Sequence, residues 1–590
     1  MLARLGGTLY RIRWIVLILA LADVIILMSN DSLKAADPAF KEAATQLLAT
    51  LKARPEVASV TSYYSTQSAS FLSRDGHETF AVVQFATKDT SVKAKNYQTI
   101  QPLITSPVLH TMVGGNVAVN NAINKQVGAD LERAELITFP IVAILLLIVF
   151  GGLVAAGLPL LIGGVAILGA FAILRLLANL TDVSVYAVNV VTMLGLGLAI
   201  DYALFIVTRF REELGHGEGD VKGALERTMA TAGRTITFSG LTVSTSLLGL
   251  MLFPEMFLRS MSMGAIAATL VAMLAALTIL PALLAVLGHR VNALSIQRLL
   301  RRNSSSQRQV TSTETRGAWF RISEMVMRRP VVVGLAVLAI LVTLGLPFLR
   351  VSFSTPDVKV LPSDQEARIV SDRLSRDFAQ QGNSQLVIVM RTPGDALSYT
   401  NLANLDTYVH AIKAIPGVVS VESLVTLNTQ LSLAYYQQLY AHPGANPQLA
   451  ATVAQLANGD TTKITVAMQP VDHSPAAVDI VHQVRAIQAT GGLTPLVDGT
   501  TAYQLDLLAS LGATLPYALL VMFAAVSVLL FLMTGSLLMP LKAIVLNILS
   551  LSAVFGALVW IFQDGHLQSL LGFQSTGSID ATQPILIFAI

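Results

Sequence analysis

Of the 590 residues, 53% are hydrophobic and only 13% are charged, whereas roughly a quarter are charged in an ordinary soluble chain. Together with a mean hydropathy of +0.64, this composition excludes a protein dissolved wholly in water. The net charge of +3 and the lack of a polybasic tract with interleaved aromatic residues exclude a nucleic-acid-binding protein. The absence of cysteine excludes disulfides and thiolate metal sites.

Motifs that would indicate an enzyme are missing. The sequence has no Gly-x-x-x-x-Gly-Lys-Ser/Thr phosphate loop, no His-Glu-x-x-His zinc motif and no Gly-x-Ser-x-Gly nucleophile motif. Asp75-Gly-His77 and Asp564-Gly-His566 each pair an acid with an imidazole, but both runs fall in expected turns. We therefore expect no enzyme, no metal and no cofactor, so that an ion gradient or a partner supplies any energy.

The amino-terminal residues 1–29 are expected to contain a shortened first membrane span or an anchor. Two arginines precede the apolar stretch Trp14–Ala22, which continues through Asp23 into strand-like Val24–Met28. The same residues must therefore serve as a span and as a strand. Three interpretations stay open: one helix over Trp14–Met28, a strand that enters from the membrane interface, and a cleaved signal sequence.

The polar residues 30–133 show alternating strand and helix patterns, and the first strand lies just before them. The predicted order is βαββαβ, the split unit of ferredoxin-like domains, so we expect a first porter domain. Its strands are predicted at Val24–Met28, Val57–Tyr64, Thr79–Ala86 and Leu109–Val113, and its helices at Pro38–Ala53 and Val92–Ile104.

Apolar runs of the length that a membrane helix needs, about 20 residues, follow in three groups. Five form a bundle over residues 134–289, a lone span covers 330–350, and two spans plus the start of a further one cover 511–590. The eight runs begin near Ile137, Ala155, Val185, Thr235, Ser260, Val331, Ala513 and Leu537.

Residues 351–510 repeat the βαββαβ order and are expected to form a second porter domain, with an insertion at Asn428–Asp460. A helical pattern at Gln365–Gln380 has no counterpart in the first half. The strands are predicted at Gln385–Met390, Val418–Leu424, Lys463–Met468 and Thr494–Val497, and the helices at Leu397–Ile415 and Ala476–Gln488.

The repeat extends into the membrane. Gly499 follows Gly115 by 384 residues, and Gly535 follows Gly151 by the same interval. The chain is therefore expected to contain two copies of one plan, an architecture that transporters use because alternating access needs two bundles that move against each other.

Basic residues predict the orientation. They gather near the amino terminus (Arg4, Arg11, Arg13), in the loop 209–234 and in the linker 290–329, and the positive-inside rule places such segments in the cytoplasm. Both polar domains then face the exoplasmic side. The linker, with Arg298, Arg301, Arg302, Arg308, Arg316, Arg321 and the run Ser304–Ser306, is either a solvated connector or a segment that attracts anionic lipid.

An acidic residue, Asp201, stands inside an otherwise apolar span and is followed by Tyr202. A carboxylate at this depth costs at least ~2.5–3.5 kcal/mol, and such residues mark functional sites by default. A group that is neutral in one state and charged in another is what a proton carrier needs. The alternative is a structural aspartate, bonded between helices or reaching the cytoplasmic interface near Arg209.

Residues around Asp201 fit the same hypothesis. Gly195 and Gly197 would let a neighbouring helix approach closely, as small residues do in bilayers. Ser239 and Thr242 on the next span are candidate polar partners, although hydroxyls in membrane helices often bond their own i−4 carbonyls.

The run Gly-x-Gly-x-Ala-Ile-Asp-Tyr-x-Leu-Phe-x-Val-x-Arg-Phe-Arg-Glu-Glu at 195–213, the run Gly-Arg-Thr-x-x-Phe-Ser at 233–239 and the duplicated layout resemble the MMPL family of the RND superfamily. The resemblance implies a bacterial cytoplasmic-membrane exporter of lipids or other hydrophobic compounds, driven by protons through Asp-Tyr pairs on the fourth and tenth spans. It assigns one pair to Asp201 and Tyr202, with Ser239 near the relay.

The sequence departs from this family pattern at both ends. Family members have twelve spans, whereas Gln583–Ile590 resembles only the opening of the tenth, so the second Asp-Tyr pair is missing. We expect proton-driven export of a lipid or hydrophobic substrate, with an oligomer or a partner supplying the missing spans. The rivals are a non-transporting relative that acts as a sensor or secretion partner, and an inactive fragment.

Overall fold

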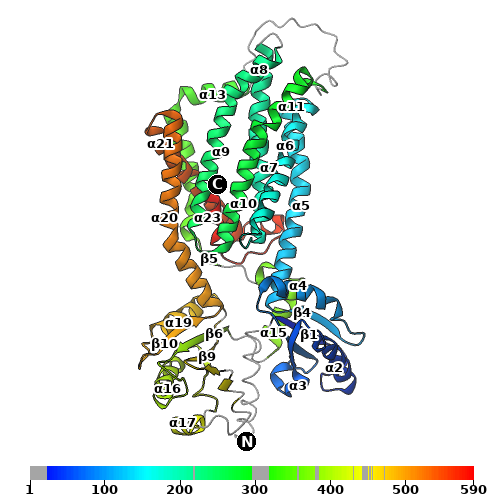
Figure 1. The fold of residues 1–590 in the computed structure, drawn as a ribbon, viewed down its shortest axis with the longest axis vertical. Coiled ribbons are helices and arrows are strands. Elements are labelled where there is room, and N and C mark those ends of the chain that lie inside the picture. Colours follow the sequence, from blue (N-terminus) through cyan, green and yellow to red (C-terminus); the bar gives the residue numbers. More distant parts are fainter. Residues whose placement is uncertain are drawn as a thin grey trace. The chain divides into compact units, whose positions relative to one another are not determined.

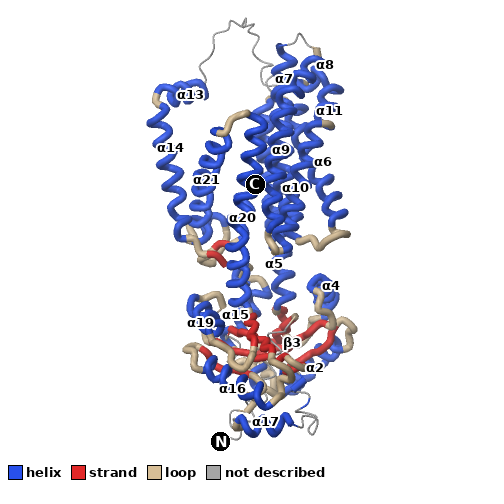
Figure 2. Tube along the Cα trace, turned by 60° about the vertical axis from the view of Figure 1, so that its left-hand side comes forward, coloured by secondary structure: helices blue, strands red, loops and turns tan. Residues whose placement is uncertain are grey.

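A computed structural model describes residues 23–216, 220–294, 318–354, 358–378, 384–428, 431–441, 450, 453–454, 456–470 and 472–589. They form two compact units (Figure 1). The strand-rich unit comprises the described residues up to Gly128 and Ser354–Leu508, and the helical unit comprises Ala129–Phe353 and those from Ala509 onward. In Figure 2, nearly all the strands, in red, belong to the strand-rich unit.

The first half of the chain contributes a four-stranded antiparallel sheet. Its strands lie in the order β2-β3-β1-β4, and alternate residues of β1 face the two helices that follow β1 and β3. Val24, Ile26 and Met28 are fully buried on that face with Phe40 and Ile100. The elements are β1 (Val24–Ser29), α2 (Pro38–Lys52), β2 (Val57–Ser62), α3 (Tyr63–Thr66), β3 (Glu78–Phe85), α4 (Thr90–Ile100) and β4 (His110–Gly114).

Strand β1 occupies the middle of this sheet, between β3 and β4. The interpretation that one helix covers Trp14–Met28 is therefore wrong, because Val24–Ser29 form a central strand that pairs with β3 over its whole length and with β4 from Ile25 onward. Asp23, 7% exposed, precedes the strand and accepts hydrogen bonds from Lys93 Nζ at 2.7 Å and the backbone N–H of Phe85 at 2.8 Å. Trp14–Ala22 and the other residues before Asp23 lie outside the described part of the chain.

The opposite face of the first sheet is covered by a helix from the second half, α15 (Glu366–Asp377). Val370 and Leu374 pack there with Phe378 against the β1 and β3 residues Leu27 and Phe80. A Cβ added at Gly114 of β4 would lie only 2.6 Å from Val370 Cγ1, so this close approach needs glycine. The helical pattern without a first-half counterpart thus completes the first-half domain.

The second half builds a similar antiparallel sheet in the order β10-β6-β9-β7, with β8 paired to β9. Its inserted segment contains α17, where the hydroxyls of the buried Tyr436 and Tyr440 donate to the carbonyls of Asn428 and Leu424. The elements are β6 (Ser384–Arg391), α16 (Tyr399–Lys413), β7 (Val418–Glu422), α17 (Leu433–Ala441), β8 (Ala457–Asn458), β9 (Thr461–Met468), α19 (Pro475–Ala486) and β10 (Thr494–Asp498).

The sequence repeat has a structural reason. Helix α5 covers Asn116–Phe150, and each bound of α20 (Thr500–Thr534) is the corresponding bound of α5 plus 384. Gly115 (φ +90°) and Gly499 (φ +132°) stand before them, where an added Cβ would lie 2.8 Å from Ile25 N and 2.6 Å from Gln385 O. Both positions therefore need glycine for its backbone freedom and its lack of a side chain.

The helical unit confirms a polytopic helical membrane protein. Eight helices of the described residues are long and apolar enough to cross a membrane, at Asn116–Phe150, Leu153–Leu177, Tyr186–Gly215, Val221–Leu252, Met256–Asn292, Pro330–Arg350, Thr500–Thr534 and Leu538–Gln563. Their exposed side chains are largely apolar, as a lipid environment requires. Its helices are α6 (Leu153–Leu177), α7 (Val185–His216), α8 (Val221–Thr228), α9 (Arg234–Leu247), α10 (Met256–Leu277), α11 (Ile279–Leu287), α13 (Ala318–Arg328), α14 (Pro330–Gly345), α21 (Leu538–Leu558), α22 (Gln568–Leu571) and α23 (Thr582–Ala589), and its short strands are β5 (Phe353–Ser354) and β11 (Ile579–Asp580).

Small residues bring the central helices of this unit together. A Cβ added at Gly163 of α6 would lie 2.7 Å from Leu196 of α7, and one added at Gly264 of α10 would lie 3.0 Å from the carbonyl of Ala187. Helices in lipid gain little from the hydrophobic effect and associate through such close packing. Helices α6 and α10 therefore hold α7 on two sides and fix the direction of its side chains.

Candidate functional site

Asp201 lies close to the midpoint of α7, about 23 Å from either end at 1.5 Å per residue. Its side chain is exposed, whereas Tyr202 and Ala203 beside it are buried. The residues of α7 around Asp201 are apolar: some of them are buried against α6 and α10, and others are apolar side chains that face outward. The carboxyl group therefore points away from the packed side of α7.

Tyr202, unlike Asp201, lies on the buried side of α7. It is 5% exposed and belongs to the same packed cluster as Ile236 of α9 and Met273 of α10. Its hydroxyl is buried and has no hydrogen-bond partner within the described structure, although the Ser239 side chain of α9 lies beside it. A buried hydroxyl without a partner is costly, so this group is available to exchange a proton or to bind water.

The two candidate hydroxyl partners on α9 differ. Thr242 donates to the carbonyl of Phe238 at 2.7 Å, so its hydroxyl is satisfied within its own helix. Ser239 is exposed and lies next to Tyr202. The structure thus brings Asp201, Tyr202 and Ser239 into one region and leaves Thr242 occupied. Ser244 of α9, a residue that sequence reasoning missed, also has a buried hydroxyl without a hydrogen-bond partner among the described residues.

The two glycines before Asp201 have different surroundings. A Cβ at Gly195 would lie 3.4 Å from Ile167 and 3.8 Å from Ala268, so this glycine lies in the contact of α7 with α6 and α10. Nothing lies within 4 Å of a Cβ placed at Gly197. Two residues along a helix turn the direction by about 200°, so the pair does not serve one helix contact.

The carboxyl end of α7 carries an ion-pair network. Glu213 accepts from Arg209 at 2.6 Å and from Arg227 of α8 at 2.7 Å, and Arg211 donates to the carbonyl of Phe150 at 2.9 Å and to Asn292 Oδ1 at 2.7 Å. The i, i+4 spacing of Arg209 and Glu213 is a sequence signal for part of this network. The partners from other helices have no such signal.

Helix α23 contains the residues that resemble the opening of a further span. It contacts α9 and α21, and Phe588 packs edge-on against Phe523 of α20 with the ring centroids 5.5 Å apart. No acidic residue occurs in α23, so Asp201 receives no carboxyl partner from it.

The remaining candidates lie elsewhere. His77 donates its backbone N–H to Asp75 at 3.1 Å in a turn where Gly76 has φ +78°, and Asp564 pairs with Arg350 at 3.4 Å. Of the linker residues, Arg321 lies on α13, whereas Arg298, Arg301, Arg302, Arg308, Arg316 and Ser304–Ser306 fall outside the described residues. Within the described ranges, no three His, Asp or Glu side chains gather as metal ligands.

A sequence profile of the MMPL family matches residues 20–333 and 359–576. The chain belongs to the MMPL family. As an MMPL protein it is 38% identical over 487 residues to a putative membrane protein of Streptomyces coelicolor (strain ATCC BAA-471 / A3(2) / M145), which covers 82% of this chain and 60% of that protein.

Two further relatives carry functional names. The trehalose monomycolate exporter MmpL3 of Mycobacterium tuberculosis (strain ATCC 25618 / H37Rv) is 32% identical over 535 residues, 87% of this chain and 54% of that protein. The mycolic acid-containing lipids exporter MmpL11 of Mycolicibacterium smegmatis (strain ATCC 700084 / mc(2)155) is 29% identical over 483 residues, 80% of this chain and 46% of that protein. The chain thus spans about half the length of these relatives.

Proposed function

We propose that this MMPL protein exports a lipid or another hydrophobic amphiphile across a bacterial cytoplasmic membrane and draws the energy from a proton gradient. Membership of the MMPL family and the names of the MmpL3 and MmpL11 relatives support lipid export. Transport, rather than catalysis, is also the activity that the apolar helical unit supports.

The observation that carries the proton coupling is the position of Asp201. An exposed carboxyl close to the midpoint of an apolar helix pays a membrane cost of ~2.5–3.5 kcal/mol when charged. Protonation removes this cost. The charged and neutral states therefore favour different surroundings of α7, so a proton that arrives from one side and leaves on the other changes the preferred arrangement of the helices.

Tyr202 and Ser239 support a short relay at this point. The Tyr202 hydroxyl is buried without a partner in the described structure and lies beside Ser239. A hydroxyl accepts and donates at once. In the proposal, these two groups and water pass the proton to and from Asp201.

The strand-rich unit fits two porter domains of ferredoxin-like topology. In the first sheet the order β2-β3-β1-β4 is that of the split βαβ unit. The basic loop 209–234 and the linker 290–329 favour a cytoplasmic location, which places both porter domains on the exoplasmic side and the amino terminus in the cytoplasm. There the domains would receive the amphiphile from the membrane.

Export by the full chain in proteoliposomes tests the proposal. A fluorescent NBD-labelled lysolipid is followed across the membrane with and without an imposed pH gradient. We expect gradient-dependent movement in the wild type and in Thr242→Val, whose hydroxyl is already bonded within α9, and loss of at least about tenfold in Asp201→Asn. Equal, gradient-independent movement in all three folded proteins would contradict proton-driven export.

A further inference from the structure

Ser244 of α9 has a buried hydroxyl that the proposed relay does not use. The residue is 7% exposed, and its side-chain oxygen has no hydrogen-bond partner among the described residues. Two neighbouring hydroxyls differ, because those of Thr242 and Thr245 each donate at 2.7 Å to the carbonyl four residues earlier, of Phe238 and Leu241. Ser244 therefore lacks the bond within its own helix that such hydroxyls often make.

The contacts between α9 and α10 show which way Ser244 faces. Residues spaced by three or four positions share one face of a helix, and the buried residues of α9 have this spacing: Ile236, Gly240, Ser244 and Leu247. A Cβ added at Gly240 would lie 2.6 Å from Met273 Sδ of α10. The Ser262 hydroxyl of α10 donates to the Leu247 carbonyl at 2.7 Å. Ser244 lies between these two contacts and therefore faces α10.

Helix α10 has a second buried hydroxyl at the same level. The two contacts show that α9 and α10 run in opposite directions, so the position four residues after Gly240 on α9 corresponds to the position four residues before Met273 on α10. These positions are Ser244 and Thr269. Thr269 is fully buried, and its hydroxyl donates to the carbonyl of Ala265 at 2.8 Å. Its oxygen can still accept a hydrogen bond.

The chemistry of this place favours water. A buried hydroxyl without a partner is costly, and lipid offers it no hydrogen bond. Water both donates and accepts, and a buried water molecule typically makes about three hydrogen bonds to polar groups that the protein leaves unsatisfied. The hydroxyl of Ser244 and the oxygen of Thr269 offer such bonds from two packed helices.

Further buried hydroxyls continue toward the end of α10 that the proposed topology places on the exoplasmic side. Ser260 and Ser262, near the start of α10, are fully buried, and Ser260 donates to the carbonyl of Asp182 at 3.3 Å. In the other direction, Ser239 precedes Ser244 by five residues, about 7.5 Å along α9. Buried hydroxyls therefore follow α10 from its exoplasmic end to the level of the relay.

We propose that Ser244 and Thr269 bind water, and that a short chain of water molecules from this site delivers protons to Tyr202 and Ser239 from the exoplasmic side. Each water molecule gives one proton toward the relay and accepts another from the exoplasmic side, so its composition is unchanged. The role in proton delivery rests on the proposed function, whereas the presence of water depends only on the packing of α9 and α10.

Water access is measured through a single introduced thiol, since the chain has no cysteine of its own. Ser244→Cys and Ala267→Cys are made in the full chain and placed in proteoliposomes without a gradient. Ala267 is the matched control: it is 4% exposed, lies two residues before Thr269 and packs with Ala187 and Val191 of α7. Ag⁺, which travels through water and not through lipid, is added, and the thiols that remain free are counted with a maleimide after denaturation.

We expect Ag⁺ to block the thiol of Ser244→Cys and to leave that of Ala267→Cys free, because only the first replaces a hydrated group. Under a pH gradient, Ser244→Val should lower lipid-stimulated proton flux at least about tenfold, the factor that one lost hydrogen bond can cost. Thr245→Val should keep the wild-type flux, because the Thr245 hydroxyl is bonded within α9.

Equal reactivity of the two thiols in folded proteins would overturn the proposal, because a serine with a purely structural role leaves its position dry. Wild-type flux in folded Ser244→Val would overturn it as well. A reactive thiol in Ser244→Cys together with no proton flux in the wild type would refute the proposed proton coupling and support the water site alone.

Discussion

At the scale of single residues, several charged side chains of the strand-rich unit have partners that the sequence does not indicate. Asp23 would be costly in a membrane helix, yet it is held by Lys93 and by the backbone of Phe85. These partners lie on α4 and at the end of β3, far along the chain. The residue that made a first span difficult to assign is thus one that anchors a folded domain.

Glu78 is expected to make the stability of the folded protein depend on pH. Burial raises the pKa of its carboxyl group above the usual value, and the Arg373 ion pair only partly opposes this effect. A carboxyl group whose pKa is higher in the folded than in the unfolded state stabilises the folded protein most at pH values below its unfolded pKa. This contribution is lost as the pH rises through its folded pKa.

We therefore expect Glu78→Gln to gain stability relative to wild type as pH rises from about 4 to 7. Melting temperatures of the full chain at a series of pH values measure the difference, with Glu42→Gln as an exposed control. A difference that stays constant with pH, or shrinks as pH rises, would show that the Glu78 carboxyl is not the group that titrates.

At the scale of elements, alternation and helical periodicity predicted the strand and helix order of both domains, and the positions differ by a few residues at most. They also predicted the eight apolar helices. Periodicity could not show that α15 packs on the sheet of the other half. The apolar face formed by Val370 and Leu374 indicates that α15 packs against another element, but not which one. The contact between Ser239 and Tyr202 likewise depends on how α7 and α9 pack.

The repeated glycines give a prediction at this scale. An alanine at Gly115 or Gly499 meets strand backbone at under 3 Å in a left-handed or related conformation, so both should misfold or lose several kcal/mol. At Gly151 and Gly535 (φ +63° and +67°) nothing lies within 4 Å of an added Cβ, so alanine should cost only about 1–2 kcal/mol. Yield and melting temperature of the four variants test this ranking, and equal losses would refute it.

At the scale of the whole molecule, the absence of cysteine makes orientation directly measurable. Tyr399 is 71% exposed in the second domain, and the Lys222 side chain is 87% exposed before α9. A membrane-impermeant maleimide should label Tyr399→Cys in intact cells and Lys222→Cys only after the membrane is opened. The reverse pattern would invert the proposed topology.

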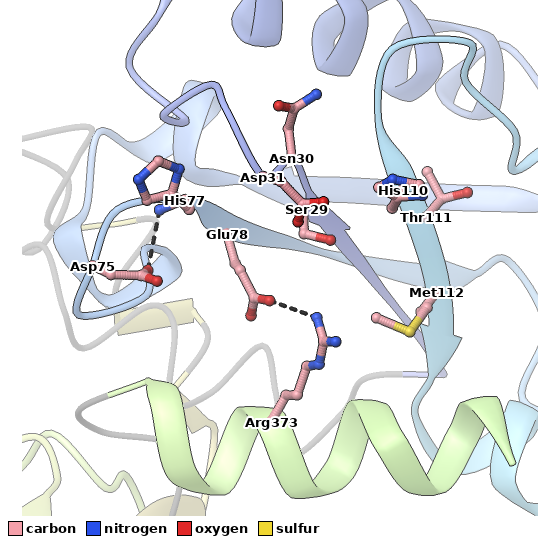
Figure 3. A pocket seen from close by; sticks show the side chains of 10 residues that line it. All are labelled: Ser29, Asn30, Asp31, Asp75, His77, Glu78, His110, Thr111, Met112 and Arg373. Atoms are coloured by element: carbon pink, nitrogen blue, oxygen red, sulfur yellow. Dashed lines mark hydrogen bonds and ion pairs between the residues drawn. The ribbon is translucent and has the colours of Figure 1, made fainter. Parts of the chain in front are cut away.

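Composition and motifs predicted the family of the whole molecule, but they could not predict which distant segments lie in contact. The runs at 195–213 and 233–239, together with the duplicated layout, predicted the family. The ion pair between Glu78 and Arg373 (Figure 3) had no motif, since one partner lies on a strand of the first half and the other on a helix of the second.

Proton movement through Asp201 is the claim on which the account depends. The direct measurement is the rate of internal pH change in proteoliposomes loaded with a pH-sensitive dye, after a pH gradient is imposed and the lysolipid is added. We predict lipid-stimulated proton flux in wild type and Thr242→Val, a reduced flux in Tyr202→Phe, and none above protein-free vesicles in Asp201→Asn. Wild-type flux in folded Asp201→Asn would contradict the account.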